Sequence, residues 1–384
     1  MIQDGIHALP RPERIHPSAK KLRDVYAITP EAPFFHKTFG LWFCLPVWYE
    51  NGLDQNTNID EFFMFDPPGV HELMELGWCE AAFLPRFEEK IIEDRGDYEI
   101  AQDFAGRHIL YFKGRRQGFM PEYLTHPVRD WKTWETDVKW RMNPHSQERF
   151  AGLEDRMRTA IEMAGQGYMM QQRIVGAYMY LRSLIGPLEL LYFFHDKPDL
   201  IHECMRAWLV LADAVTAKHQ QYVTFDEVFF GEDICYNHGS LISPDMIREF
   251  LFPYYQQLIR NIKSRQIDKT RHLYVQVDTD GYSVPVIDLY REAVGLDAMC
   301  PFEVASGCDV VRTGKDYPDL VISGGIDKRI LAQDRQAIDR HLDYILPAMW
   351  KRGGYIPTCD HGVPEEVTWE NYLHYRKRCV EFGR

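Results

Sequence analysis

The sequence predicts an α/β protein, a (β/α)8 barrel with an N-terminal extension. From residue 168 onward, strand-like apolar runs alternate with helical segments about six times, which indicates a parallel sheet covered by helices. The glycine-rich first turn that is usual in doubly wound sheets is absent. A chain of 384 residues has the length of one barrel domain. We therefore expect a single domain over 1–384, with 1–40 as the extension and 41–384 as the barrel.

The first part of the chain carries weaker signals. Early prolines interrupt any helical period, so residues 1–60 are expected to be irregular with short helices. GLWFCLPVWYENG (40–52) predicts a core strand and a turn, and 69–92 predicts a helix. The alternation in 96–114 predicts a hairpin. An irregular crossing at 121–135 and a helix at 149–167 follow.

The second part of the chain has a regular rhythm. Strands are expected at 168–176, 227–234, 272–277, 296–303, 320–327 and 355–360. Helices are expected at 179–194, 197–221, 244–265, 283–294, 307–315, 334–352 and 368–382. The helix that follows Ser243 begins with Pro244, and the one before the last strand ends at Gly353, which are typical start and stop residues.

Composition narrows the class of function. The formal net charge of −13, without a basic stripe, argues against a nucleic-acid or anionic-membrane partner. No run of 18 apolar residues is present, and the N-terminus lacks the apolar core of a secretory signal. The eight cysteines form no CxxC pair, which suits reduced thiols. We expect a cytoplasmic protein.

Ionisable and polar residues follow the predicted strands. In a (β/α)8 barrel the catalytic groups come from the carboxyl ends of the strands, which all meet at one rim. The side chains expected there are Gln171, Gln172, Arg173, Glu232, Asp233, Asp278, Asp280, Glu303, Asp327, Lys328, Cys359, Asp360 and His361. Such a convergence of charged groups predicts a functional pocket at this rim.

Two carboxylates in VQVDTDG (275–281) stand one residue apart at the end of a strand. Asp278 and Asp280 point to the same side and repel each other unless a positive charge compensates them. One candidate is a divalent cation, with Mg²⁺ or Ca²⁺ favoured by carboxylates alone and Zn²⁺ by Cys359 or His361. The alternative is a metal-free pocket in which Asp278 or Asp280 pairs with Lys328 or an arginine.

Several motifs resemble the uroporphyrinogen decarboxylase superfamily over roughly residues 30–380. The matching stretches are GFMPEYLTHPVRDWKTWE (118–135), RSLIGPLELLYFFHDKPDLIHECM (182–205), GEDICYNHGSLISPDMIREFLFPYY (231–255), VDTDG (277–281), PFEVASGCDVVR (301–312), SGGIDKRILA (323–332) and GGYIPTCDHGVP (353–364). The resemblance implies the same barrel fold, and its family members suggest a homodimer.

The superfamily contains two chemistries. Its haem-pathway decarboxylases use no metal and carry an Arg-Gln-Ala-Gly-Arg signature, which is absent here, and LPRPERIHP (9–17) lacks its spacing. Its methyltransferases hold zinc by a His-x-Cys pair and a late Cys, and related methionine synthases add a Glu. The resemblance places Asp278 and Asp280 at the His-x-Cys positions, Glu303 at the Glu and Cys359 at the late Cys. We therefore expect a divalent metal, with zinc favoured, on these four residues.

Carboxylates in place of soft ligands would make such a metal a harder Lewis acid, suited to an ether oxygen. The resemblance therefore points to methyltransferases of the O-demethylase type, which pass a methyl group from a methoxylated small molecule to a corrinoid protein. His361 or Asp360 would protonate the departing oxygen, as a general acid does. The residues expected to position the substrate or wall its pocket are Glu232, Asp233, Gln171, Arg173, Asp327, Lys328, Trp42 and Trp48. A tetrapyrrole-type decarboxylase and a non-catalytic binding protein are the alternatives.

Overall fold

Seven parallel strands form the central sheet of the computed structural model, which describes residues 15–114 and 121–382. They are β1 (Val70–Leu76), β6 (Met169–Val175), β7 (Glu227–Gly231), β10 (Tyr274–Asp278), β11 (Ala298–Cys300), β12 (Val321–Ser323) and β13 (Tyr355–Ile356). Each strand pairs with the next along the chain, without the reversal of order found in doubly wound sheets. The predicted α/β class with a parallel sheet is confirmed. The described residues place seven strands in this sheet, not eight.

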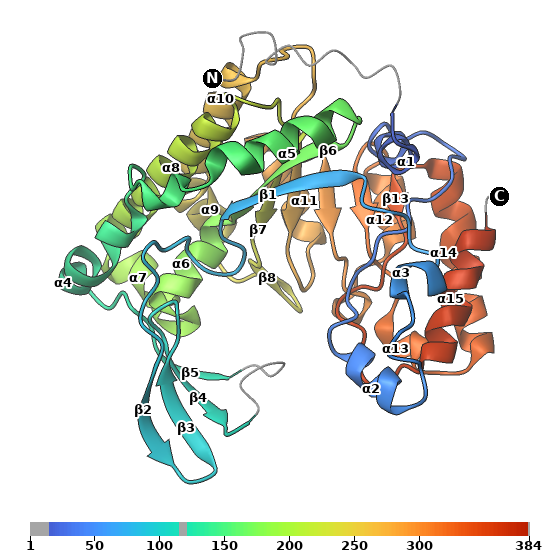
Figure 1. Ribbon diagram of the computed structural model, residues 1–384, viewed down its shortest axis with the longest axis horizontal. Coiled ribbons are helices and arrows are strands. Elements are labelled where there is room, and N and C mark those ends of the chain that lie inside the picture. Colours follow the sequence, from blue (N-terminus) through green and yellow to red (C-terminus); the bar gives the residue numbers. More distant parts are fainter. Residues whose placement is uncertain (1–14, 115–120, 383–384) are drawn as a thin grey trace.

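The first helix, α1 (Pro17–Tyr26), closes the amino end of the curled sheet (Figure 1). Leu22 and Tyr26 of α1 share one apolar cluster with side chains of six of the seven strands. Those strand residues are Val70, Met169, Tyr274, Ala298, Val321 and Ile356. Because β1 and β13 are the two edges of the sheet, their convergence on one helix shows that the sheet curls around it. Residues 15–40 therefore form part of the barrel's packing.

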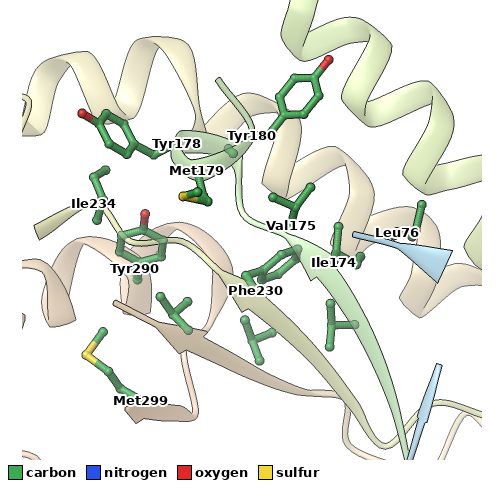
Figure 2. Close-up of a cluster of buried hydrophobic side chains, with 14 of the residues drawn as sticks. Leu76, Ile174, Val175, Tyr178, Met179, Tyr180, Phe230, Ile234, Tyr290 and Met299 are labelled. Carbon is green, nitrogen blue, oxygen red and sulfur yellow. The ribbon is translucent and has the colours of Figure 1, made fainter. Parts of the chain in front are cut away.

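Helices cover the outside of the sheet, where Figure 1 shows α5, α8 and α10 on one side and α14 and α15 on another. They include α5 (Leu153–Gly165), α6 (Ala177–Ile185), α7 (Pro187–Asp196), α8 (Pro198–His219), α9 (Pro244–Phe250), α10 (Phe252–Arg265), α11 (Ile287–Val294), α12 (Val310–Asp316), α13 (Lys328–Leu331), α14 (Arg335–Arg352) and α15 (Trp369–Glu381). Figure 2 shows part of the buried layer between strands and helices, with Ile174 of β6 and Phe230 of β7. None of the described helices has the length and apolar character needed to cross a bilayer.

A four-stranded antiparallel sheet lies between β1 and α5 in the chain and projects from the barrel (Figure 1). It contains β2 (Lys90–Arg95), β3 (Tyr98–Gln102), β4 (His108–Phe112) and β5 (Glu122–Thr125). The expected hairpin at 96–114 is confirmed as β3 and β4. The remaining short elements are α2 (Cys44–Glu50), α3 (Ile59–Phe62), α4 (Trp131–Thr133), η2 (Trp134–Val138), η3 (Lys139–Met142), η4 (Glu148–Phe150), β8 (Cys235–Tyr236), β9 (Gly239–Ser240), η5 (Val284–Val286) and η6 (Val304–Ser306). Residues 1–14 of the expected extension and residues 118–120 of the crossing motif lie outside the described residues.

Two predicted elements are wrong. The segment 69–92 contains no helix, because 70–76 forms β1 and 90–95 begins the antiparallel sheet. A bulge between Leu73 and Leu76 lets leucines three positions apart both be buried, which imitates helical spacing. The segment 40–52 contains α2 in place of a strand. Pro46 lies in the first turn of α2, where a missing backbone N–H breaks no helical hydrogen bond.

Candidate active site at the carboxyl ends of the strands

The end of β10 directs two carboxylates toward the mouth of the barrel. Asp278 ends the strand, and Asp278 and Asp280 both line a cavity of about 180 Å³. The intervening Thr279 is buried, and its hydroxyl accepts hydrogen bonds from the backbone N–H groups of Ile234 and Cys235 at 3.0 and 3.1 Å. Gly281 has a φ of +79°, and a β-carbon there would lie 2.8 Å from the backbone of Tyr236. The DTDG sequence thus fixes this turn against the neighbouring loop.

His361 and Asp280 form an ion pair across this cavity. The imidazole Nε2 lies 3.3 Å from Oδ2 of Asp280, and the two side chains are 36% and 40% exposed. The hydrogen bond that the imidazole donates to Asp280 raises the pKa of His361 above its ordinary value, against the opposing effect of burial. Trp42 meets the imidazole edge-on, with ring centroids 6.2 Å apart. The pair is therefore a source of protons beside an aromatic wall.

Asp278 lies deeper than Asp280. Burial, followed by the nearby charge of Asp280, raises the pKa of Asp278 to about 7, and the positive charge of Lys37 opposes this rise. The carboxyl group therefore exchanges its proton near neutral pH, unlike an ordinary aspartate. Asp278 also lines a second cavity of about 550 Å³ that extends into the barrel and shares Phe39, Trp42 and Trp78 with the first.

Asp233, which follows β7, also lines the smaller cavity. Its carboxylate Oδ2 is 2.7 Å from Nη2 of Arg182 on α6. The backbone of Asp233 has a φ of +46°, a left-handed conformation that is costly for a residue other than glycine. This turn aims the side chain of Asp233 into the cavity while its neighbour Glu232 faces the opposite way.

Glu232 and Trp48 lie outside the cavities, against the sequence-based expectation. Glu232 is fully buried behind the strands, where it accepts hydrogen bonds from the Tyr178 N–H at 3.1 Å and from the Tyr255 hydroxyl. It thus accepts from a backbone N–H group at the buried amino end of α6 that has no partner within the helix. Trp48 is 1% exposed and donates to the Val367 carbonyl in the core, because the turns of α2 direct it away from the barrel mouth.

Asp360 and Asp327 were expected at the mouth of the barrel, but the structure holds both carboxylates against nearby backbone turns. Asp360 is fully buried and accepts from the backbone N–H groups of Val304 and Lys328 at 2.9 and 3.1 Å. Asp327 accepts from the Arg329 N–H at the start of α13 and pairs with the Arg329 guanidinium. Both carboxylates are therefore held by the backbone turns that they stabilise.

The predicted metal ligands do not gather around one point. Lys328 Nζ lies 2.9 Å from Glu303 Oε1, and the Gly281 N–H donates to Glu303 Oε2 at 2.9 Å, so this carboxylate is already engaged. Cys359 is 1% exposed, and burial raises the pKa of its thiol, which disfavours a thiolate ligand. Across the described chain, no three His, Cys, Asp or Glu side chains are grouped to hold a metal ion. These residues do not fit a metal in the described arrangement.

The barrel interior contains further polar groups. Gln171 and Arg173 project inward from β6, where Gln171 donates to Glu227 at 2.8 Å and Arg173 pairs with Glu72 at 2.9 Å. Gln172, between them, is fully buried on the other face and contacts His219. Arg173 also stacks 3.9 Å above the ring of Trp78. Gln171 and Arg173 thus lie in the barrel as expected, although within the strand and not at its end.

The residues that line the cavities and escaped prediction include Lys37, Phe39 and Trp78. Lys37 and Phe39 belong to an extended segment without any periodic signal, so nothing in their surroundings singles them out. Trp78 follows β1 directly, and recognition of that strand would have placed it at the rim. Its ring stacks on Phe229 at 5.1 Å and lines both cavities, which makes it a shared wall.

Fold and site together define an α/β barrel protein with titratable groups at the carboxyl ends of its strands. A family model described as uroporphyrinogen decarboxylase (URO-D) matches residues 123–381. The chain belongs to this enzyme family.

Individual relatives are more distant. A uroporphyrinogen decarboxylase from Hydrogenobaculum sp. is 24% identical over 210 residues, which are 54% of this chain and 57% of that protein. The matched region thus spans little more than half of the relative. A methyltransferase from Methanosarcina mazei has a similar structure, with a TM-score of 0.58 and 12% identity over 95% of this chain and 98% of its own. A putative vitamin-B12 independent methionine synthase from Listeria monocytogenes gives a TM-score of 0.32, with 14% identity over 57% of this chain and 65% of its own.

Proposed function

We propose that the protein is a methyltransferase of the O-demethylase type, which removes a methyl group from a methoxylated small molecule. The acceptor is a reduced corrinoid carried on a separate protein, which takes the methyl group from the bound substrate. The observation that carries the proposal is the His361–Asp280 pair, an imidazole with a raised pKa beside a small, aromatic-walled cavity. The structural similarity to a methyltransferase supports the fold that this chemistry requires.

The proposed reaction breaks the bond between the methyl carbon and the ether oxygen. The methyl group leaves without the bonding electrons, which stay on the oxygen, and the reduced acceptor supplies the electron pair for its new bond to the methyl carbon. His361 donates a proton to that oxygen, so the product departs as a hydroxyl compound and not as a poor alkoxide leaving group. Asp280 stabilises the protonated imidazole before the transfer, because opposite charges at hydrogen-bond distance favour the charged form.

The remaining lining residues hold the substrate. Phe39, Trp42 and Trp78 give the smaller cavity apolar walls that displace water from the ether oxygen. Asp233 is kept in place by Arg182 and offers a hydrogen-bond acceptor in the same cavity. Trp42 is 53% exposed at the mouth, on the face where we expect the corrinoid protein to dock. The reaction proposed here uses the side chains of the cavity alone, since Glu303 is engaged with Lys328 and Cys359 is buried away from the cavity.

The experiment is a methyl-transfer assay with isotopically labelled methoxy compounds and free cob(I)alamin as the acceptor. We expect label to move to the cobalamin with the wild-type protein, and to do so far more slowly with His361→Gln. His145→Gln is a matched control, because His145 is exposed on a loop away from the cavity. Equal transfer by both variants would contradict the role of His361, and binding without transfer to any acceptor would favour a non-catalytic relative.

Decarboxylation is the second candidate, and one observation favours it besides the family match. A carboxyl group with a pKa of about 7, such as Asp278, is a suitable proton donor to the carbanion left after loss of carbon dioxide. The lining argues against a substrate with many carboxylates, since Lys37, Arg173 and the protonated His361 are its cations among the described residues, and Arg173 and His361 are already paired with Glu72 and Asp280. Incubation with uroporphyrinogen, followed by measurement of carbon dioxide and of less carboxylated porphyrins, separates the two reactions.

A further inference from the structure

Three charged side chains beside the mouth of the barrel contact one another and not the cavities. Glu303, Lys328 and Asp360 follow three neighbouring strands, β11, β12 and β13. None of the three is among the residues that line the 180 and 550 Å³ cavities. Their partners are each other and the backbone of nearby turns, including the turn that carries Asp280.

Asp360 connects the ends of three strands. Its carboxylate accepts hydrogen bonds from the backbone N–H groups of Val304 and Lys328 at 2.9 and 3.1 Å. Its own N–H donates to the Ile326 carbonyl at 2.9 Å. Because His361 is the next residue in the chain, the backbone that carries the imidazole is fixed to the loops after β11 and β12.

Glu303 connects this group to the turn at the end of β10. Its Oε1 lies 2.9 Å from Nζ of Lys328, and its Oε2 accepts from the Gly281 N–H at 2.9 Å. That N–H belongs to the peptide directly after Asp280, so the hydrogen bond fixes the backbone from which the Asp280 side chain projects. The Glu303 and Lys328 side chains are 19% and 22% exposed, so water screens their attraction less than that of a surface pair.

These contacts and the His361–Asp280 ion pair form a closed ring across four strand ends. The ring runs from Asp280 through Gly281, Glu303, Lys328 and Asp360 to His361. Neither end of the ring can move away from the other without stretching the His361–Asp280 contact or breaking one of the bonds behind it. Catalytic groups have to be held to within about 0.5 Å of their working geometry, which such supporting contacts provide.

We propose that Glu303 and Lys328 are positioning residues that hold Asp280 within hydrogen-bond reach of His361. This inference rests on the proposed function, because it gives both residues a part in proton donation by His361. Glu303 is then a support for the acid and not the metal ligand expected from the sequence, since both of its carboxylate oxygens are used within the ring.

The first test measures kcat and KM of methyl transfer to cob(I)alamin in Lys328 variants. We expect Lys328→Met to lower kcat by about 10- to 100-fold, as a misplaced catalytic group does, and to change KM by less than about twofold. Lys328→Arg keeps the charge and should retain most of the activity. Lys113→Met is the matched control, because Lys113 pairs with Asp94 at 2.7 Å on the antiparallel sheet, and its kcat should equal that of the wild type.

A double variant tests whether the two residues act together. Lys328→Met combined with Glu303→Gln should lower kcat no further than the more harmful single change, because both changes break the same ring. Glu303→Gln keeps the shape of its side chain and provides the same comparison with the wild type if Lys328→Met does not fold. Additive losses of kcat would overturn the proposal.

The last measurement does not depend on turnover. The ¹⁵N chemical shift of His361 Nε2 at one fixed pH reports its hydrogen bond to Asp280, and its absence in His361→Gln assigns the signal. We expect the shift to change in Lys328→Met and in Glu303→Gln but not in Lys113→Met. An unchanged shift in both ring variants, or equal losses of kcat in Lys328→Met and Lys328→Arg, overturns the proposal. If the shift changes as expected but the wild-type protein transfers no methyl group, the positioning of Asp280 stands and the proposed function falls.

Discussion

Nε2 of His361 lies 3.3 Å from Oδ2 of Asp280, so the charge of the imidazole depends on a residue three strands away in the barrel order. Asp280 follows β10 and His361 follows β13, with β11 and β12 between them. The curvature of the sheet is what allows these two strand ends to approach. The pKa of His361 at the mouth of the barrel therefore depends on the curvature of the sheet.

Replacing Asp280 by Asn should lower the pKa of His361. The hydrogen bond and charge of Asp280 are the main reasons that this pKa is raised, so their loss favours the neutral ring. A general acid is active while protonated, and activity is lost as pH rises through its pKa. The basic limb of the pH–rate profile should therefore move to lower pH. Asp316→Asn, on the surface, should not move it, and an unshifted limb in Asp280→Asn would show that another group is the acid.

His361→Gln should reduce turnover more than binding. Loss of a general acid typically lowers the rate by about 10²- to 10⁴-fold. The substrate contacts from the aromatic walls remain, so KM should change by less than about fivefold. Steady-state kinetics with both parameters measured separate these effects. A rise in KM at unchanged kcat would instead assign His361 to binding.

Asp278→Asn should stabilise the protein above neutral pH. The folded state holds the proton of Asp278 up to a pKa of about 7, whereas the unfolded chain releases it near 4. The folded state therefore binds more protons between these values, and stability falls as pH rises through this window. The variant lacks this fall, so we expect it to be more stable than wild type by about 4 kcal/mol at pH 8 and to differ little at pH 4. Urea unfolding at both pH values measures the difference.

Chelation should leave methyl transfer unchanged if the described arrangement is the active one. Glu303 is engaged with Lys328, and Cys359 is a buried thiol with a raised pKa. The first measurement is methyl transfer with and without a chelator. The second is metal analysis after reconstitution with Zn²⁺, for the wild-type protein and for Cys359→Ala and Glu303→Gln. One equivalent of metal that is lost in both variants would establish the ligand set expected from the sequence, and would require Glu303 to release Lys328.

Four of the side chains that the sequence predicts at the strand ends lie together in the structure. Asp233, Asp278, Asp280 and His361 do line one cavity, because parallel strands deliver their carboxyl ends to the same rim. Their neighbours Glu232 and Asp360 were expected there too, yet both are fully buried elsewhere. Which of two adjacent residues faces the cavity depends on the backbone after the strand. The φ of +46° at Asp233 is set by tertiary contacts that sequence patterns do not encode.

The first third of the chain was the least predictable part. The bulge of β1 produces helical spacing, so the sequence predicts a helix where the structure has a strand. Without that strand, the position of Trp78 at the rim cannot be predicted. Trp48 was expected in the pocket wall, whereas the helical phase of α2 buries it and the exposed wall residue is Trp42. Lys37 belongs to no repeating pattern, so it was found only from the geometry of the cavities.

The two edge strands of the curled sheet, β1 and β13, share no backbone hydrogen bond in the described part of the chain, although side chains of both pack on α1. Widening the barrel along this seam would break side-chain contacts but no strand ladder. The seam is therefore the place where the barrel can widen around a bulky ligand without losing backbone hydrogen bonds between strands. Amide hydrogen exchange should show it as faster exchange along the open edge of β1 than in β7, whose two neighbours protect it.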